Sequence, residues 1–319
     1  MSPSIPKTMK AVVIDKFGGP QVLHVASLPV PEPAENEVLV RVRLAGVGVW
    51  DPWVREGGAG SGRFPLVLGT DGAGMVEARG SKVRRFKVGD RVYSYTFDNP
   101  QGGFYAEYAA VPEDAAEVVP ANISTEEAGA LAASGVTALL GLEELRLKSV
   151  GTLLILGASG GVGHIALQLA KRMGLRTLAV ASGRDGVLLV RRLGADMAVN
   201  GHGASIVGTI KGFAPDGLDA ALVFANSESL ADVLKQVKAG GRIAYPNGVE
   251  PEPKGRPGVR VHAFDGIGSP EVYERLNSLI SRGPFEVTIS RTYKPEEAAR
   301  AHRDVLKHHI GKLGLKMSA

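Results

Sequence analysis

A glycine-rich turn between an apolar run and a helix is the part of the sequence best suited to chemistry. Residues 153–174 read LLILGASGGVGHIALQLAKRMG, with four glycines in the seven positions 157–163. In a dinucleotide-binding turn, such glycines allow a tight bend, a close approach of backbone to pyrophosphate and close packing of helix on strand. The phosphate then rests at the N-terminus of the helix. This turn predicts a dinucleotide site.

The spacing of the turn departs slightly from the common G-x-G-x-x-G, because Ala158 takes the first place and Gly157 stands just ahead of it. A glycine trio alone is also compatible with a purely structural turn. Here the turn lies within a series of strand and helix patterns, which favours the cofactor interpretation. The residues expected to hold the cofactor at this turn are Gly157, Ser159, Gly160, Gly161, Val162 and Gly163.

The end of the next strand pattern distinguishes between dinucleotides. An NAD site usually places Asp or Glu there to bond the ribose 2′-hydroxyl. Residues 179–186 read AVASGRDG, in which Asp185 is better placed to begin the next helix. Arg184 can hold a 2′-phosphate through charge-assisted hydrogen bonds, and Ser182 can add a hydroxyl donor. A solvated arginine is the alternative for Arg184, but the missing acid favours NADPH.

Composition and missing motifs exclude several other kinds of site. The chain has no cysteine, no His-Glu-x-x-His motif and no nucleophile elbow, so no metal is expected and no cysteine nucleophile is possible. The 37 basic and 33 acidic residues form no block of like charge, and no run of eighteen apolar residues occurs. Neither nucleic acid nor a membrane is therefore expected as a partner. The lack of cysteine, and of an apolar leader in MSPSIPKTMK, makes a cytoplasmic location the expectation.

The first third of the chain has the pattern of short β-strands. In EVLVRVRL, residues 37–44, the apolar residues Val38, Val40 and Val42 recur at period two. Further strand-like runs are residues 9–14, 66–78, 89–95 and 104–112. This pattern favours a small barrel or sandwich over a parallel sheet. The glycine-dense segment 55–65 is expected to be a mobile loop.

The pattern changes at Ser124, which forms a capping-box signature with Glu127 at the start of a helix. A second helical run is expected over residues 136–145. Strand and helix patterns then alternate, which predicts a parallel sheet with helices on both faces. The expected strands are residues 152–157, 176–181, 195–200, 218–224, 241–246 and 259–264. A last β-α-β pattern is expected from strand 285–293, helix 295–309 and strand 312–317.

Taken in order, these motifs resemble the medium-chain dehydrogenase/reductase superfamily, in its zinc-free quinone oxidoreductase (zeta-crystallin-like) branch. The likeness spans residues 9–317 and is carried by MKAVVIDKFGGPQVL, GVWDPWVREG, PLVLGTDGAGMVEARGSKV, FKVGDRVY, GGFYAEYAAVP, GVTALLGL, GASGGVGHIALQLAK, RRLGAD and EEAARAHRDVLKHHIGKLGLKM. It implies an α/β protein in which a GroES-like β-barrel substrate domain, residues 1–123 completed by 284–319, joins a Rossmann domain, residues 124–283. The Rossmann domain is a doubly wound parallel sheet that would bind NADPH.

Departures from the family bear on the reaction. Zinc-dependent relatives take catalytic ligands near what are here Gly48, Thr70 and Ala133, and none of these can bind a metal. The branch often has asparagine at the position of Gly48 and tyrosine at the position of Trp53, so an amide and a phenol are missing. A lysine that often helps to hold the 2′-phosphate is Gly186 here. These changes put catalytic roles in question more than fold or cofactor.

A site without a Lewis acid or a strong general acid does not easily stabilise the alkoxide formed from a simple ketone. Quinones and conjugated enones spread the incoming charge themselves, so orientation of a nicotinamide hydride is sufficient. Reduction of a quinone or enone by NADPH is therefore expected. Asp51 and Trp53 are the candidate catalytic-pocket residues, and the resemblance implies that Thr137 lies against the nicotinamide. Asp51 is equally well explained as a turn or capping residue ahead of Pro52.

Two further expectations concern a second function class and the assembly. The missing asparagine and tyrosine leave open an NADPH-binding structural or sensor protein with vestigial reductase activity. The strand VRVHAF, residues 259–264, is expected to lie outermost in a sheet of order 3-2-1-4-5-6. An apolar strand at a sheet edge favours pairing with a second copy, so a homodimer is expected.

Overall fold

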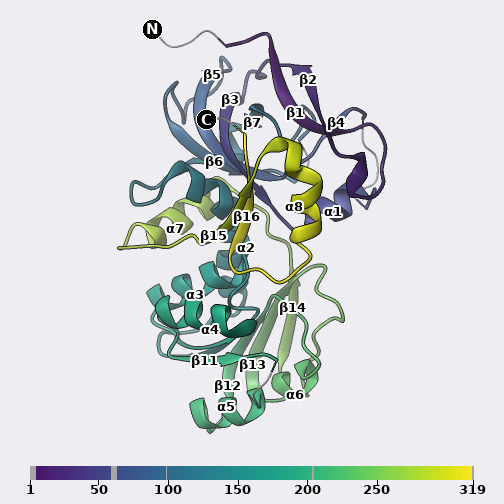
Figure 1. Ribbon diagram of the computed structural model, residues 1–319. Coiled ribbons are helices and arrows are strands. Elements are labelled where there is room, and N and C mark those ends of the chain that lie inside the picture. The colour runs from purple at the N-terminus through teal and green to yellow at the C-terminus, as the bar shows by residue number, and fades with distance from the viewer. Residues whose placement is uncertain (1–4, 59–62, 98, 203–204, 318–319) are drawn as a thin grey trace. The chain divides into compact units, whose positions relative to one another are not determined.

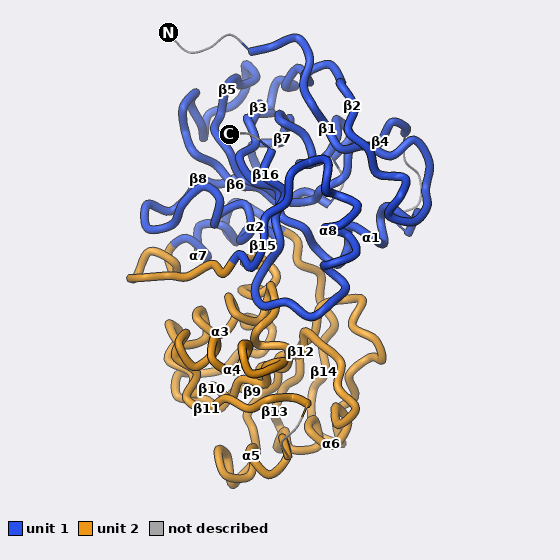
Figure 2. The backbone as a smooth tube through the Cα atoms, in the orientation of Figure 1, with its two compact units in different colours: residues 1–133, 268–277, 289–319 blue, residues 134–267, 278–288 orange. Residues whose placement is uncertain are grey.

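The computed structural model describes residues 5–58, 63–97, 99–202 and 205–317, and Figure 1 shows the order of its elements. The chain divides into two units, coloured separately in Figure 2. Unit 1 comprises Met1–Ala133, Gly268–Asn277 and Ile289–Ala319, and unit 2 comprises Ser134–Ile267 and Ser278–Thr288. Within the glycine-dense segment 55–65, for which a mobile loop is expected, residues 59–62 lie outside the described residues.

Unit 1 is dominated by β-strands in two sheets. Its strands are β1 (Thr8–Ile14), β2 (His24–Pro29), β3 (Glu37–Val47), β4 (Leu66–Val67), β5 (Asp71–Arg79), β6 (Arg91–Tyr95), β7 (Tyr108–Pro112), β8 (Ala116–Val118), β15 (Ile289–Tyr293) and β16 (Lys312–Lys316). One sheet has the order β2-β1-β4, and the other has the order β15-β16-β3-β5-β6-β8 with β7 paired to β3. The period-two residues Val38, Val40 and Val42 are buried in its core, as their spacing predicts.

The strand expectations for unit 1 need two corrections. The run 66–78 is not one strand but two, β4 and β5, which belong to different sheets. Between them Gly69 has φ +94°, a left-handed conformation that breaks an extended run. Strands β2 and β8 were not anticipated, because their short sequences alternate weakly. The β-α-β pattern at the end of the chain is confirmed: β15 and β16 are parallel, and helix α8 (Ala298–Asp304) lies between them in the sequence.

Helix α2 (Thr125–Glu144) begins with the predicted capping box. The Ser124 hydroxyl accepts from the Glu127 N–H at 3.1 Å, and the Glu127 carboxylate accepts from the Ser124 N–H at 2.7 Å. The two separate helical runs expected here are wrong, because α2 continues through both. Glycine at 135 disfavours a helix interior by only about 1 kcal/mol. Burial of Leu131, Leu139 and other apolar residues along the helix opposes that cost.

Unit 2 contains a six-stranded parallel sheet. Its strands are β9 (Thr152–Leu156), β10 (Arg176–Ala181), β11 (Met197–Asn200), β12 (Leu218–Val223), β13 (Val237–Pro246) and β14 (Arg260–Phe264). Their spatial order is β11-β10-β9-β12-β13-β14, which confirms the predicted order 3-2-1-4-5-6 with β14 at one edge. Every residue of the central strand β9 is buried, so the sheet is covered on both faces. The fold class predicted from the sequence is thus confirmed.

Helices connect the strands of this sheet in chain order. They are α3 (Gly163–Arg172), α4 (Gly183–Arg192), α5 (Ile206–Phe213) and α6 (Leu230–Leu234). Helix α3 packs on β9 and β10, which brings the start of the helix to the carboxyl end of β9. Helices α1 (Trp50–Arg55) and α7 (Pro270–Ile280) complete the fold. Within the described residues no helix is long and apolar enough to cross a membrane.

The unit limits fall at residues other than the expected 123/124 and 283/284, because α2 and α7 each contribute to both units. In unit 1, Tyr273 of α7 accepts from the backbone N–H of Tyr95 and donates to the Ala115 carbonyl. Asn277 accepts from the hydroxyl of Tyr93 at 2.8 Å. These side-chain bonds join the first turns of α7 to the strands of unit 1.

Candidate cofactor and substrate sites

The predicted dinucleotide turn lies between β9 and α3, where the expected residues Gly157, Ser159, Gly160, Gly161, Val162 and Gly163 follow one another. Gly157 has φ +81°, which L side chains rarely adopt. A Cβ at Gly163 would lie 2.1 Å from the Gly157 carbonyl oxygen, so only glycine lets the helix start this close to the turn. The backbone therefore has the tight turn and the close helix start that the sequence pattern predicts for a pyrophosphate cradle.

The second part of the predicted cofactor site is joined to this turn by a hydrogen bond. The backbone N–H of Ser182 donates to the Ser159 Oγ at 3.2 Å, which connects the end of β10 to the turn. Arg184 lies exposed in the first turn of α4. A Cβ at Gly186 would lie 2.8 Å from the Ser159 Oγ. Helix α4 therefore lies so close to the turn that a side chain at position 186 would require Ser159 or the helix to move.

His202 belongs to the same corner, although it did not stand out in the sequence. Its Nε2 lies 2.9 Å from the Ser182 Oγ. The residue follows β11, the neighbour of β10 in the sheet. Because parallel strands end at one edge of a sheet, the first polar residues after β10 and β11 are brought together. That rule is the signal by which His202 could have been found.

Thr137, the remaining predicted cofactor residue, lies on α2 and not in the turn. Its Oγ1 lies against Gly266, where a Cβ would approach it to 2.5 Å. Gly266 follows β14, at the far side of the sheet order from β11. Within unit 2, Thr137 therefore lies beside the residues that follow β14, whereas Ser182 and Arg184 are themselves the residues that follow β10.

In unit 1, the candidate residue Asp51 is buried, with 1% of its surface exposed. Its Oδ2 accepts hydrogen bonds from the Gly48 N–H at 2.7 Å and from the Tyr105 hydroxyl at 3.0 Å. The pKa of Asp51 is raised from its ordinary 3.8 to about 7, because burial, and to a lesser extent the charge of Asp71, outweigh the lowering by these hydrogen bonds and by Lys312. Burial and the Asp51 carboxylate likewise raise the pKa of Tyr105 well above 10. Asp51 therefore carries a carboxyl that titrates near neutral pH.

A buried ion pair lies next to Asp51. The Lys312 Nζ is 3.5 Å from the Asp71 Oδ2, and the side chains are 8% and 1% exposed. A Cβ at Gly46 would lie 2.5 Å from the same carboxylate oxygen, so that glycine leaves room for it. The second buried carboxylate of this region is thus balanced by a cation from β16.

A third buried charged group is Arg55, at the end of α1. Its guanidinium donates to the Gly18 carbonyl at 2.9 Å and to the His302 Nδ1 at 3.0 Å, and it also pairs with Glu56. Burial and the Arg55 charge lower the pKa of His302 from 6.5 to about 3. The imidazole is thus neutral and packs edge-on against Tyr105, with ring centroids 5.8 Å apart. His302 gave no local sequence signal.

These pKa shifts predict opposing effects of pH on stability. The pKa of Asp51 is raised on folding, so its contribution to stability is lost as pH rises from about 4 to 7. The pKa of His302 is lowered, so its contribution is lost as pH falls from about 6.5 to 3. Between pH 4 and 6.5 the two slopes, each up to about 1.4 kcal/mol per pH unit, oppose each other.

Asp51→Asn should remove the pH dependence of stability that comes from Asp51 and leave the one that comes from His302. The free energy of unfolding of this variant, measured with urea between pH 4.5 and 6.5, should fall more steeply on acidification than that of the unmodified protein. The exposed Asp114→Asn serves as the matched control and should leave the slope unchanged. Identical slopes for Asp51→Asn and the unmodified protein would contradict the burial-driven shift.

The candidate residue Trp53 belongs to an exposed aromatic cluster, which we call the aromatic triad: Trp50, Trp53 and Phe97. The three side chains are 38%, 43% and 47% exposed. The two indole rings meet edge-on at 5.7 Å, and each lies 6.4 Å from the Phe97 ring. Trp50 and Trp53 flank Asp51 on α1, so an apolar, ring-lined surface and a buried carboxyl come from the same short helix.

The positions at which zinc-dependent relatives take ligands remain Gly48, Thr70 and Ala133 in this chain. A Cβ at Gly48 would lie 3.8 Å from the Asp51 Oδ2, so the side-chain position of the family's asparagine borders this carboxylate. Among the residues that the structure describes, no group of three or more His, Cys, Asp or Glu side chains could hold a metal ion.

Comparison with known proteins gives a consistent result. The family models "Alcohol dehydrogenase GroES-like domain" and "Zinc-binding dehydrogenase" match residues 34–122 and 161–254. The quinone oxidoreductase of Mus musculus is 31% identical over 97% of both chains. The chloroplastic NADPH-dependent alkenal/one oxidoreductase of Arabidopsis thaliana is 34% identical over 90% of this chain and 73% of its own length. The Escherichia coli quinone oxidoreductase complexed with NADPH superposes with a TM-score of 0.83 and 25% identity, covering 96% of this chain and 99% of that one.

Proposed function

The chain belongs to the medium-chain dehydrogenase/reductase superfamily, among its quinone oxidoreductases, and we propose that it transfers hydride from NADPH to a quinone or an α,β-unsaturated carbonyl. The observation that carries this proposal is the β9–α3 turn, with its glycine cradle and its hydrogen bond to the end of β10. The names of the mouse, plant and bacterial relatives support it.

The residues around the turn fit NADPH. The cradle at Gly157–Gly163 would receive the pyrophosphate, and Ser182, Arg184 and His202 would surround the 2′-phosphate. No carboxylate stands at the end of β10 before Asp185, so the acid that binds a free 2′-hydroxyl is missing. NADPH, when bound, supplies the hydride.

On the substrate side, we assign Trp53 and its neighbours in the aromatic triad to the wall against which a flat acceptor packs. Asp51, buried on the same helix, accepts hydrogen bonds from the Gly48 N–H and the Tyr105 hydroxyl and titrates near neutral pH. A zinc-independent reaction is proposed because the chain has no cysteine and lacks ligands at the three family positions. The same lack of cysteine is the ground for proposing a cytoplasmic location.

The assay that tests this function is NADPH oxidation with 1,4-benzoquinone, 9,10-phenanthrenequinone and a simple enone as acceptors. We expect turnover with at least one acceptor, unchanged by added zinc or by a chelator. Trp53→Ala should lower kcat/KM about tenfold for phenanthrenequinone, because burying an aromatic ring against another contributes about 1–1.5 kcal/mol. Tight NADPH binding without turnover on any acceptor would favour the structural or sensor protein instead.

A homodimer through β14 is also proposed. The strand lies at an edge of the parallel sheet, and its residues Arg260 to Ala263 are exposed or half-buried. Pairing with the same strand of a second copy about a two-fold axis would give the unpaired backbone N–H and C=O groups of both edge strands hydrogen-bond partners. Light scattering at micromolar concentration should report twice the mass of the chain, and Val261→Pro should shift it toward the monomer. A monomeric unmodified protein would refute this assembly.

A further inference from the structure

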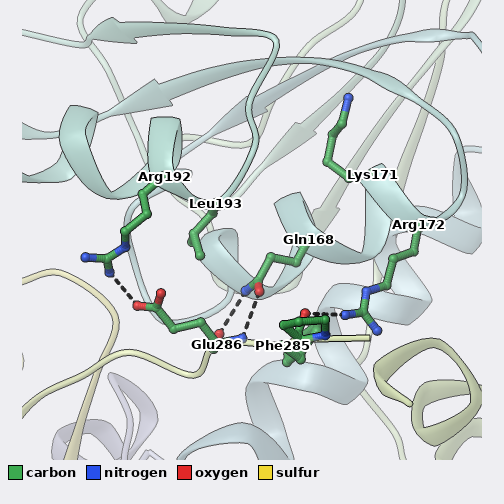
Figure 3. A pocket seen from close by; sticks show the side chains of 8 residues that line it. Gln168, Lys171, Arg172, Arg192, Leu193, Phe285 and Glu286 are labelled. Carbon is green, nitrogen blue, oxygen red and sulfur yellow. Dashed lines mark hydrogen bonds and ion pairs between the residues drawn. The ribbon is translucent and has the colours of Figure 1, made fainter. Parts of the chain in front are cut away.

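Three polar side chains on one face of α3 bind the backbone of a distant segment of unit 2, residues 279–288. They are His164, Gln168 and Arg172, at positions i, i+4 and i+8, which lie above one another on a helix. Figure 3 shows Gln168 and Arg172 extending from this helix toward residues 285 and 286. The segment leads directly into β15.

Gln168 and Arg172 fix the backbone of this segment. The Gln168 amide donates to the Glu286 carbonyl at 2.8 Å and accepts from the Glu286 N–H at 2.9 Å. The Arg172 guanidinium donates to four backbone carbonyls of the segment, those of Leu279, Ile280, Gly283 and Pro284. These two side chains therefore hold the segment through its main-chain groups.

His164 binds both this segment and the dinucleotide turn. The side chain is fully buried. Its Nε2 lies 3.1 Å from the Thr288 backbone nitrogen, and its Nδ1 lies 2.8 Å from the Gly160 carbonyl oxygen. An N–H requires a lone pair at Nε2, so the ring proton must be on Nδ1, where the Gly160 carbonyl accepts it. The imidazole thus bridges Thr288 and Gly160 as one neutral tautomer.

We propose that His164 is a positioning residue for cofactor binding: held by Thr288, it sets the orientation of the peptide between Gly160 and Gly161. In a planar trans peptide, the C=O and the following N–H point in opposite directions. The Gly160 carbonyl accepts from the backbone N–H of His164 at 3.1 Å and also faces the imidazole Nδ1. Holding it on this side directs the Gly161 N–H away from it, available to a phosphate oxygen. This inference rests on the proposed function, because the group served is the pyrophosphate of NADPH.

Two conservative variants of His164 each keep one of its two hydrogen bonds, either to Gly160 or to Thr288. In His164→Asn the amide nitrogen takes the place of Nδ1 and keeps the bond to Gly160. In His164→Gln the longer side chain places its oxygen near the position of Nε2 and keeps the bond to Thr288 instead. The dissociation constant of NADPH, measured by fluorescence titration, should rise about tenfold in His164→Gln and stay within about threefold in His164→Asn.

Gln168→Leu is the matched control, because it loses the bonds to Glu286 and leaves the bond to Gly160 intact. Its Tm should fall, whereas its NADPH dissociation constant should stay within about twofold of the unmodified protein. Equal dissociation constants for the Gln and Asn variants, or a Gln168→Leu effect as large as that of His164→Gln, would overturn the positioning role. An unmodified protein that binds no NADPH would instead overturn the proposed function, and this inference with it.

A second measurement needs no substitution and so does not depend on a variant that folds. Bound NADPH should make local opening of the dinucleotide turn rarer. Because His164 connects this turn to Thr288, local opening of the segment 279–288 should become rarer as well. Amide hydrogen exchange of Thr288 should therefore slow when NADPH is added. Exchange at Thr288 that is unchanged by saturating NADPH would count against the coupling.

Discussion

Replacing Lys312 by methionine should lower the free energy of unfolding by about 3–5 kcal/mol, because it leaves a buried carboxylate without its cation. Methionine has nearly the length of lysine and keeps the packing of its stem. The Asp71 carboxylate, 1% exposed and 3.5 Å from the Lys312 Nζ, would lose its cation while remaining buried. Urea unfolding at pH 7 measures the change.

The double variant Asp71→Asn with Lys312→Met removes both charges and should recover most of the lost stability, because no uncompensated charge remains buried. An exposed pair provides the control. Lys82 and Glu35 lie 2.5 Å apart with side chains 70% and 65% exposed. Lys82→Met should therefore change stability by less than about 1 kcal/mol. A Lys312→Met effect as small as that of Lys82→Met would show that Asp71 does not depend on this ion pair.

Arg184→Ala should weaken NADPH binding by about 1.5–3 kcal/mol, which corresponds to roughly a 10- to 150-fold rise in the dissociation constant. The reason is the loss of a charge-assisted contact with the 2′-phosphate at the start of α4. NADH lacks this phosphate, so its binding should change by less than about threefold. Fluorescence titration of both cofactors against the same protein preparation gives the comparison.

Arg191 provides the matched control for Arg184, because it is another exposed arginine in the last turn of the same helix. Arg191→Ala should leave the binding of both cofactors unchanged. His202→Ala removes the group that lies 2.9 Å from the Ser182 Oγ and should give a smaller loss than Arg184→Ala, again confined to NADPH. If Arg184→Ala weakens NADPH and NADH equally, Arg184 does not read the 2′-phosphate.

Local patterns in the sequence determined most of the fold. The alternation of strand and helix patterns from residue 152 onward predicted a parallel sheet, and the order 3-2-1-4-5-6 expected of a Rossmann fold is the one observed. The capping box at Ser124 and Glu127 was also predictable, because it depends on atoms within one turn. The glycine turn at 157–163 is a third example, since the close approach of Gly163 to the Gly157 carbonyl lies within the turn itself.

The same local reasoning failed where long-range packing overrides local preference. It divided α2 at Ser134–Gly135, although the buried apolar residues along both halves keep one continuous helix. It predicted one strand-like run over β4 and β5, although a left-handed glycine separates these strands and they belong to different sheets. For α2 the deciding energy comes from the apolar surface that the helix buries, whereas between β4 and β5 the left-handed conformation of Gly69 ends the extended run.

The buried polar groups depended on the tertiary structure alone. Asp51 meets a tyrosine 54 positions away, Lys312 meets an aspartate 241 positions away and Arg55 meets a histidine 247 positions away. The sequence by itself determined the glycine turn and the missing acid after β10, because both are specified by neighbours in the chain. Only the folded chain decided which distant charges share a buried site, since a charge tolerates burial only beside a partner, and packing chooses that partner.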